Sequence, residues 1–274
     1  ADPMATSPRR PTMRSVALPA EHGGWGLTLE PGILGVLLAP SPAGVLLGVA
    51  ALLAFLVRTP LRLVLVGWHR PTDRAPTVMG VARTQLATRV AAAELVAIAL
   101  AVAAAAILAE DPLWWLPMAV AAPLFALALW FDMRSLSRNL VPEIVGSVAI
   151  AGVAAMGALA GGASWQLAVG AWIILGARIL SSIPHVRAQV LRIHGREAQA
   201  RPIILGDLAA LSTALAAVLL EPTLVLGAAS IGVLVAVQRV TLVRPPRPAR
   251  VLGVRQMILG FGVVAATAMG VWLL

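Results

Sequence analysis

The sequence contains no cysteine and no lysine. Without cysteine the chain forms no disulfide, no thiolate metal site and no cysteine nucleophile, so its redox compartment is left open. Without lysine, all 21 basic residues are arginine. The P-loop pattern GxxxxGK[ST], the hydrolase pattern GxSxG and the zinc-protease pattern HExxH are absent as well. No motif therefore indicates nucleotide hydrolysis, serine-hydrolase chemistry or zinc proteolysis.

Charged side chains are scarce: they make up 12% of the 274 residues, whereas 59% are apolar. Soluble domains have about 25% charged and about 45–50% apolar residues. With a mean hydropathy of +0.90, this composition indicates a polytopic membrane protein. A formal charge of +9 would suggest a nucleic acid partner in a soluble protein. In a membrane protein arginine gathers in cytoplasmic loops, so we expect contacts with membrane lipids and none with nucleic acid.

Nine apolar runs are long enough, or nearly so, to supply the ~20 residues that cross a bilayer core. They lie at about 25–40, 43–68, 88–109, 113–131, 140–160, 165–192, 202–220, 222–240 and 251–273. We predict an all-α fold, a bundle of nine transmembrane helices that forms one domain over residues 21–274. Residues 1–20 are expected to be a vector scar, Ala1–Pro3, followed by a short cytoplasmic tail.

Arginine sorts to one side of this predicted bundle. The turns near residues 40, 111, 162 and 221 contain no arginine, while every loop on the other side contains at least one. The positive-inside rule then predicts a multi-pass membrane protein with the N-terminus cytoplasmic and the C-terminus outside. Two long cytoplasmic loops are expected, at about 69–88 and 192–201, after the second and sixth spans.

Polar residues form a stripe at helical spacing on each of these two spans. The stripe on the sixth span consists of Arg178, Ser181, Ser182, His185, Gln189 and Arg192. The stripe on the second span consists of Arg58, Arg62, Leu65 and His69. An arginine facing lipid costs roughly 2.5–3.5 kcal/mol on insertion scales. We therefore predict that the two stripes meet across one basic chamber that opens to the cytoplasm.

The positive charge of such a chamber can be neutralised in two ways. Arginine's planar fork is suited to an anionic ligand. Alternatively, the arginines pair with acids inside the spans, for which Glu30, Glu94, Glu143 and Asp207 are available. A stripe neutralised by acids would make a structural ion-pair network, and one neutralised by a ligand would make a binding site.

Histidine and glutamate side chains offer a third interpretation, a zinc or iron site. The candidate ligands are His22, His69, Glu143 and His185, but no two have ligand spacing within one helix. A metal site would require convergence in space, and we predict none.

The segment ahead of the first span has the pattern Pro-x-Glu-His-Gly-x-Trp, carried by Pro19, Glu21, His22, Gly23 and Trp25. This pattern, followed by hydrophobic spans in a chain of this size, resembles the YwiC-like family of bacterial integral membrane proteins. The resemblance adds Glu21 and His22 to the candidate residues and implies no particular reaction.

A second resemblance is to the UbiA-type intramembrane prenyltransferases, which are nine-helix bundles with functional loops after helices two and six. Residues 185–195 and 201–206 look like the second signature of that family. The aspartates that hold magnesium there are missing, because this region has His185, Gln189 and Arg192, and the loop after span two has only Asp73. We therefore expect no magnesium chemistry and no cofactor. Whether the chain is a divergent prenyltransferase or not an enzyme stays open.

The predicted function is to bind, and in the enzymatic case to modify, an anionic or quinone/isoprenoid-type lipid. The alternatives are a small-anion transporter and a non-catalytic membrane scaffold. The candidate ligand-binding residues are Glu21, His22, Arg58, Arg62, His69, Arg178, His185, Arg187 and Arg192.

Overall fold

The computed structural model describes residues 12–17, 24–68, 78–134 and 139–274. These ranges are helical and contain no strand, which confirms the all-α prediction. The elements are α1 (Met13–Ala17), α2 (Gly24–Leu38), α3 (Pro42–Trp68), α4 (Val78–Leu108), α5 (Leu116–Met133), α6 (Leu140–Ala160), α7 (Trp165–Ile193), α8 (Ala200–Leu220), the 3-10 turn η1 (Pro222–Leu224), α9 (Val225–Val243) and α10 (Ala249–Leu273).

Seven helices of the described residues are long and apolar enough to cross a membrane: α3, α4, α6, α7, α8, α9 and α10. Two further apolar helices are shorter, Trp25–Leu38 within α2 and Leu116–Ala128 within α5. Each of the nine predicted ranges overlaps one of these helices, and the chain is a multi-pass membrane protein by helix length and composition.

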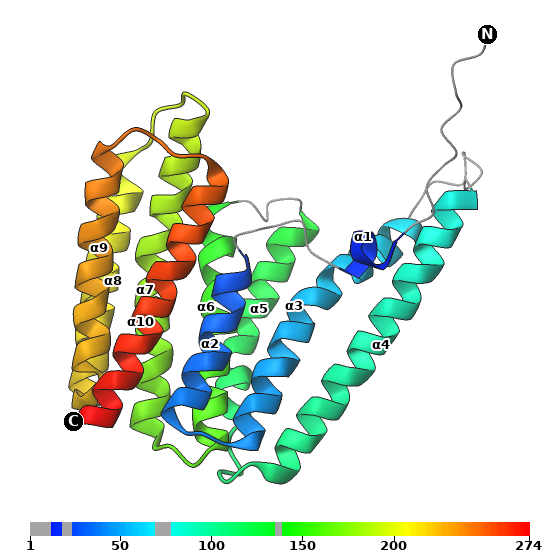
Figure 1. The fold of residues 1–274 in the computed structure, drawn as a ribbon, viewed down its shortest axis with the longest axis horizontal. Coiled ribbons are helices and arrows are strands. Elements are labelled where there is room, and N and C mark those ends of the chain that lie inside the picture. The colour runs from blue at the N-terminus through cyan, green and yellow to red at the C-terminus, as the bar shows by residue number, and fades with distance from the viewer. Residues whose placement is uncertain (1–11, 18–23, 69–77, 135–138) are drawn as a thin grey trace.

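The helices stand side by side, and their connections fall at two ends (Figure 1). The turns at 39–41, 109–115, 161–164 and 221–224 lie at one end together with the C-terminus, and they carry no arginine. The connections at 194–199 and 244–248 lie at the other end and carry Arg196, Arg244 and Arg247. We call these the arginine-free end and the arginine end.

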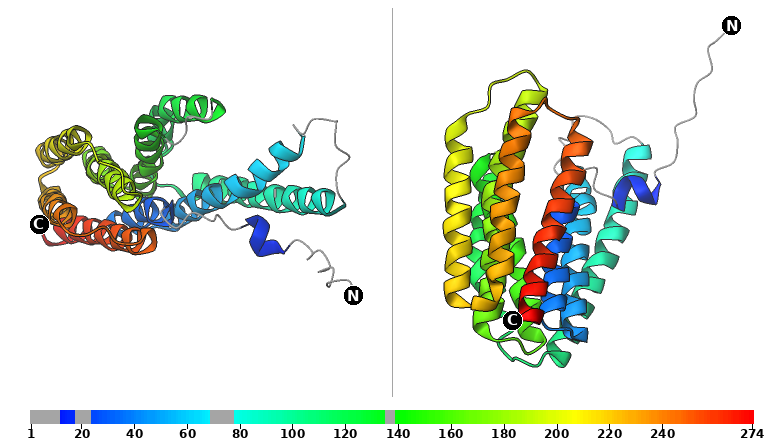
Figure 2. Two further views of the ribbon diagram at one scale, coloured as in Figure 1. Left: turned by 90° about the horizontal axis from the view of Figure 1, so that it is seen from above. Right: turned by 60° about the vertical axis from the view of Figure 1, so that its left-hand side comes forward.

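Helix α7 lies at the centre of the larger part of the bundle, where α2, α6, α8, α9 and α10 pack against it. It is the most buried of the seven long apolar helices, and α4 is the least buried. The paired helices α3 and α4 project from the rest as an arm, and α1 packs against both (Figure 2). Among the seven long apolar helices, α4 is therefore the one whose surface is least covered by other helices.

The start of α4 differs from the prediction. Residues 78–88, expected as the second half of a long loop, form the first turns of α4, so the predicted loop boundary was wrong. The physical reason is burial: Ala87 and Val90 of α4 pack with Val64 of α3 and Val16 of α1 in one apolar cluster. Packing along α3 extends the helix beyond its apolar core, since most helical stability in proteins comes from tertiary packing.

Helices α2, α3 and α6 approach one another closely at glycines. A Cβ atom added at Gly32 of α2 would lie 3.0 Å from the Cα of Gly48 on α3. One added at Gly35 would lie 2.9 Å from the carbonyl oxygen of Ala154 on α6. Small residues let membrane helices pack backbone to backbone, and here they hold α2 closely against α3 and α6.

Candidate functional site

The stripe predicted on the sixth span lies on α7, and most of it is buried. Arg178, Ser181, Ser182, His185 and Gln189 are each at most 4% exposed. The helix begins at the N-cap Ser164, whose side chain accepts a hydrogen bond from Leu167 N. It ends before Gly195, which has a φ of 70° and turns the chain toward α8. The central position of α7 thus gives each polar side chain a neighbouring helix to contact.

Arg178 forms a buried ion pair with Glu30 of α2. Its Nη2 donates to Glu30 Oε1 at 2.8 Å and to the backbone oxygen of Gln256 on α10 at 3.1 Å. The two side chains are 4% and 2% exposed. Gly260 of α10 makes the space, because a Cβ there would overlap the Glu30 carboxylate and lie 2.6 Å from Arg178 Nη2. An acid, and not an external anion, therefore neutralises the most deeply buried arginine.

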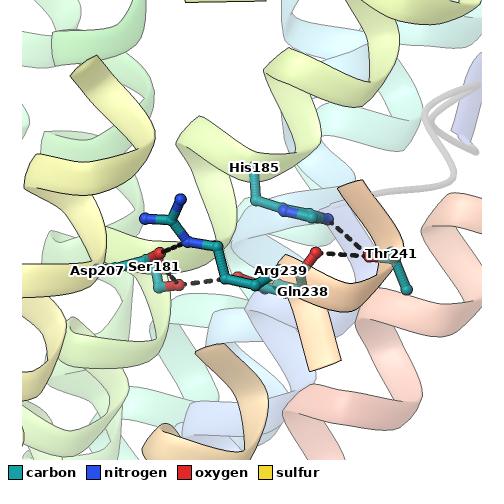
Figure 3. A network of polar contacts seen from close by, with 6 residues as sticks. All are labelled: Ser181, His185, Asp207, Gln238, Arg239 and Thr241. Carbon is teal, nitrogen blue, oxygen red and sulfur yellow. Dashed lines mark hydrogen bonds and ion pairs between the residues drawn. The ribbon is translucent and has the colours of Figure 1, made fainter. Parts of the chain in front are cut away.

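A second group of contacts surrounds Ser181 (Figure 3). The hydroxyl oxygen is 2.7 Å from Oδ1 of Asp207 on α8 and 2.8 Å from Oε1 of Gln238 on α9. A hydroxyl has one proton, so it donates to one of these oxygens at a time. The other carboxylate oxygen of Asp207 accepts from Nε of Arg239. This group joins α7, α8 and α9.

Gln238 links the two groups. Its Nε2 donates to the hydroxyl of Ser182 at 3.0 Å and, more weakly, to Oε1 of Gln256 at 3.4 Å. The result is one connected set of buried side chains, which we call the polar core. Its members are Glu30, Arg178, Ser181, Ser182, His185, Asp207, Gln238 and Gln256.

His185 belongs to the polar core through Thr241 of α9 (Figure 3). The hydroxyl of Thr241 donates to the backbone oxygen of Gln238 at 2.8 Å. That hydroxyl oxygen is also 3.3 Å from Nε2 of His185, so Nε2 carries the proton and donates to it. The other ring nitrogen, Nδ1, is buried and has no hydrogen-bond partner within the described residues.

The last two residues of the stripe satisfy the backbone of α9. Gln189 Nε2 donates to the carbonyl oxygen of Thr241 at 3.0 Å. Arg192 donates to the carbonyl oxygen of Leu242 at 2.6 Å and to that of Arg244 at 3.0 Å. The final carbonyls of a helix lack intrahelical donors, and a basic side chain there is favourable to the helix dipole. Arg192 therefore caps α9.

A pocket of about 180 Å³ opens at the arginine end between α7, α9 and α10. Its lining residues are Gln189, Thr241, Arg244, Pro245, Arg247, Leu252 and Arg255. Three of these are arginines and none is acidic. The Nε atom of Arg255 is buried and has no hydrogen-bond partner within the described part of the chain. We call this the basic pocket; unlike the polar core, its positive charge has no carboxylate opposite it.

The remaining candidate residues lie elsewhere. Arg58 and Arg62 are exposed on α3, and the structure does not bring them to the stripe on α7. The reason is the helix order, since α2 and α6 pack against α7 while α3 packs against α1, α2, α4 and α6. Arg187 points away from the polar core and pairs with Glu143 of α6 at 2.9 Å. Glu21, His22 and His69 lie outside the described residues.

Three of the four acids considered for the stripe have an arginine partner: Glu30, Glu143 and Asp207. The fourth, Glu94, lies on α4, and its Oε2 atom is buried with no hydrogen-bond partner in the described ranges. Among all the described residues, no group of three histidine or acidic side chains is placed to hold a metal ion.

Sequence reasoning missed the partners on α9 and α10. Gln238, Arg239 and Thr241 of α9, with Gln256 and Arg255 of α10, complete the polar core and the basic pocket. A signal was present, because polar side chains within membrane spans are rare and usually face the interior of the bundle. Considering every such residue in all nine predicted spans would have found them.

The fold and its interior define a class: an all-helical multi-pass membrane protein whose central helix carries a buried polar core. Within that class, the sequence model of the YwiC-like proteins matches residues 18–158, which is more than half of the chain. The chain belongs to the YwiC-like family. No curated protein and no solved structure matches it. The match includes Glu30 and Glu143, and it ends before α7.

Proposed function

We propose that this protein binds an anionic or quinone/isoprenoid-type lipid at the basic pocket. In this proposal nine helices cross the bacterial cell membrane as a UbiA-like bundle, with the N-terminus in the cytoplasm and the C-terminus outside. The arginine end faces the cytoplasm. The proposal concerns binding without magnesium.

The observation that carries the proposal is the charge of the basic pocket. Arg244, Arg247 and Arg255 surround about 180 Å³ with no acidic residue in the lining. Arginine side chains that line one small pocket repel one another unless something negative lies between them. Guanidinium groups bind phosphate and carboxylate directly. Gln189 and the backbone around Thr241 add polar groups beside them. A negatively charged headgroup, or the carbonyl oxygens of a quinone, fits these donors.

The sorting of arginine supports the orientation. The described turns at the arginine-free end carry no arginine. Connections with and without arginine alternate along the chain only if α2 and α5 also cross the membrane. The shorter apolar lengths of α2 and α5 then correspond to helices that cross with little tilt.

The polar core also supports a site that opens to one side only. Arg178 lies about 20 Å along α7 from Trp165, at 1.5 Å per residue. Between them α7 buries apolar residues, and Ile174, Leu224, Ile231 and Val263 form an apolar cluster around it. Among the described residues, this apolar cluster separates the polar core from the arginine-free end, which argues against the small-anion transporter. No contact among the residues that the structure describes favours the scaffold alternative.

The test measures the unfolding temperature of the purified full chain with and without each added probe. The probes are phosphatidylglycerol, menaquinone and inorganic phosphate, each compared with phosphatidylcholine. A ligand that binds the folded state raises its stability in proportion to the logarithm of its concentration over Kd. We expect phosphatidylglycerol or menaquinone to stabilise, and phosphatidylcholine not to.

Variants locate the effect. Arg247→Gln and Arg255→Gln are expected to weaken the stabilising lipid about tenfold each, the loss of one charged hydrogen bond. Arg250→Gln is the matched control, because Arg250 is exposed in the same segment and does not line the pocket. Equal effects of all three variants would contradict the proposal. Stabilisation by inorganic phosphate alone would favour a soluble anion as the ligand.

Orientation is tested separately in this cysteine-free chain. Cysteines are introduced singly at two exposed positions, Pro112 at the arginine-free end and Gln199 at the arginine end. An impermeant thiol reagent applied to intact cells should label Pro112→Cys only. Labelling of Gln199→Cys alone would reverse the proposed topology.

A further inference from the structure

A second concave surface lies on the other side of α7 from the basic pocket. It is a groove of about 410 Å³ between α6, α7 and α8. Its apolar walls include Leu140 and Ile144 of α6, Leu180 and Pro184 of α7, and Leu205 and Ala209 of α8. Helix α7 lies between α6 and α8, and both of these helices pack against it (Figure 2).

The groove owes its shape to a proline and a glycine. Pro184 has no N–H, so the carbonyl oxygen of Leu180 lacks its usual donor in α7. Gly206 of α8 packs against that carbonyl, where a Cβ atom would lie 2.5 Å from the oxygen. This contact draws α8 toward α7 at the floor of the groove, while Leu205, 55% exposed, stands beside it as a wall.

Charge is confined to one end of the groove. Arg201 lines it in the first turn of α8, is exposed, and forms no ion pair within the described residues. Arg187 and Glu143 flank the same end, and they neutralise each other at 2.9 Å. Among the residues that line the groove, Arg201 is therefore the one that carries a charge. From Arg201 to Ala209 the groove runs about 12 Å along α8, at 1.5 Å per residue.

We propose that this groove binds one anionic phospholipid of the surrounding membrane. Its phosphodiester lies at Arg201, and an acyl chain lies along the apolar walls toward Ala209. One negative charge matches the one arginine in the lining, and the apolar walls lie on helices that are long and apolar enough to cross a membrane. A soluble phosphate would leave those walls uncovered. This site is separate from the ligand of the basic pocket and does not rest on it.

The first measurement uses phosphatidylglycerol with a photoactivatable group in one acyl chain. The full chain is reconstituted in phosphatidylcholine nanodiscs that contain a small fraction of the probe, irradiated, and mapped by mass spectrometry. Adducts are expected to concentrate on Ile144 and Leu205. Equal labelling of exposed residues on α4 or α9, such as Leu100 and Val233, would overturn the proposal.

Two variants with matched controls separate the headgroup from the chain. Arg201→Gln is expected to lower the preference for phosphatidylglycerol over phosphatidylcholine about fivefold in native mass spectrometry. Arg89→Gln, an exposed arginine on α4, should leave the preference unchanged. Ala209→Leu fills the groove and should remove most of the adducts, whereas Ala216→Leu, seven residues further on the same face and exposed, should not.

The outcomes are distinct. No preference for the anionic lipid, or equal effects of each variant and its control, would overturn the proposal. Full competition by soluble glycerol phosphate would assign the site to a free phosphate and overturn it too. If Ala209→Leu does not fold, Arg201→Gln still decides, because an exposed residue is changed. Variants of the basic pocket, Arg247→Gln and Arg255→Gln, should leave these adducts unchanged.

Discussion

Helices α7 and α3 carry nearly the same sequence pattern and place it in opposite environments. In α7, Arg178 is followed seven residues later by His185, and in α3, Arg62 is followed seven residues later by His69. Arg178 is 3% exposed and pairs with Glu30, whereas Arg58 and Arg62 are exposed. The difference comes from the neighbours. Helices α2, α8, α9 and α10 present acids and amides to α7.

The arginines of α3 meet the membrane in another way. At 1.5 Å per residue, Arg62 lies about 9 Å and Arg58 about 15 Å from the helix end at Trp68. Long basic side chains near a helix end extend toward the interface and keep their charge in water. The arginines of a membrane helix can therefore be accommodated in two ways. They pair with acids inside the bundle, or their side chains extend toward the membrane–water interface.

The largest expected effect separates these outcomes directly. Arg178→Leu leaves the buried Glu30 without its partner, and we expect the free energy of unfolding to fall by about 3–5 kcal/mol. Unfolding in mixed micelles with increasing SDS measures it. Arg58→Leu is the control, and it should leave stability unchanged or higher because an exposed charge is removed.

A double variant sharpens this test. Glu30→Leu combined with Arg178→Leu removes both charges, and it should recover much of the loss, since buried pairs replaced by apolar residues are often neutral. If Arg178→Leu is as stable as the parent protein, the acid does not neutralise this arginine, and the comparison between α7 and α3 fails.

The second effect concerns the space that α10 leaves for the ion pair. Gly260→Ala places a methyl group onto the Glu30 carboxylate, and we expect a loss of about 1–3 kcal/mol from forced repacking. Gly262→Ala, two residues further on the same helix, meets nothing within 4 Å and should be neutral. The same SDS titration compares them, and equal stabilities would show that α10 does not seat the pair.

The third effect is within the polar core beside the ion pair. Ser181→Ala removes the hydroxyl that Asp207 and Gln238 share, which should cost about 1–2 kcal/mol because buried acceptors lose a donor. Ser212→Ala on α8 is exposed and should change stability little. A neutral Ser181→Ala variant would mean that this hydroxyl is not needed to hold α8 and α9 on α7.

The smallest expected effect on stability is tested by substituting the last arginine of each stripe. Arg192→Met removes the donors to the final carbonyls of α9, and we expect a loss of about 0.5–1.5 kcal/mol. Hydrogen exchange should also quicken at the amides around residues 240–243. Arg62→Met on α3 should show neither change, and a similar change in both variants would contradict the capping role of Arg192.

Hydropathy predicted nine ranges that each overlap a helix, and seven of these helices are long and apolar enough to cross a membrane. The turn at 161–164 is rich in glycine and separates α6 from α7, so those boundaries agree with the structure within a residue. The start of α4 was missed because residues 78–88 become helical through contacts with α3 and α1, which are distant in sequence. Local composition does not report such contacts.

The candidate site was predicted in part. Helical spacing identified the buried face of α7 from Arg178 to Gln189 correctly, since periodicity reports which residues share a face. It does not report which helix lies opposite, and so the predicted meeting of the stripes on α7 and α3 is not seen. The actual partners, Glu30, Asp207, Gln238 and Gln256, come from four helices whose order around α7 is a property of the whole fold.

The ion pair between α2 and α7 has a consequence for the order in which the helices insert into the membrane. Glu30 and Arg178 are 148 residues apart in the chain. At the usual 5–20 residues per second of synthesis, α2 emerges roughly 7–30 seconds before its partner exists. An unpaired carboxylate in a short apolar helix is a poor candidate for release into lipid. We therefore expect α2 to insert stably only after α7 has been synthesised. In a chain truncated after α6, α2 should stay at the membrane surface or bound to the insertion machinery.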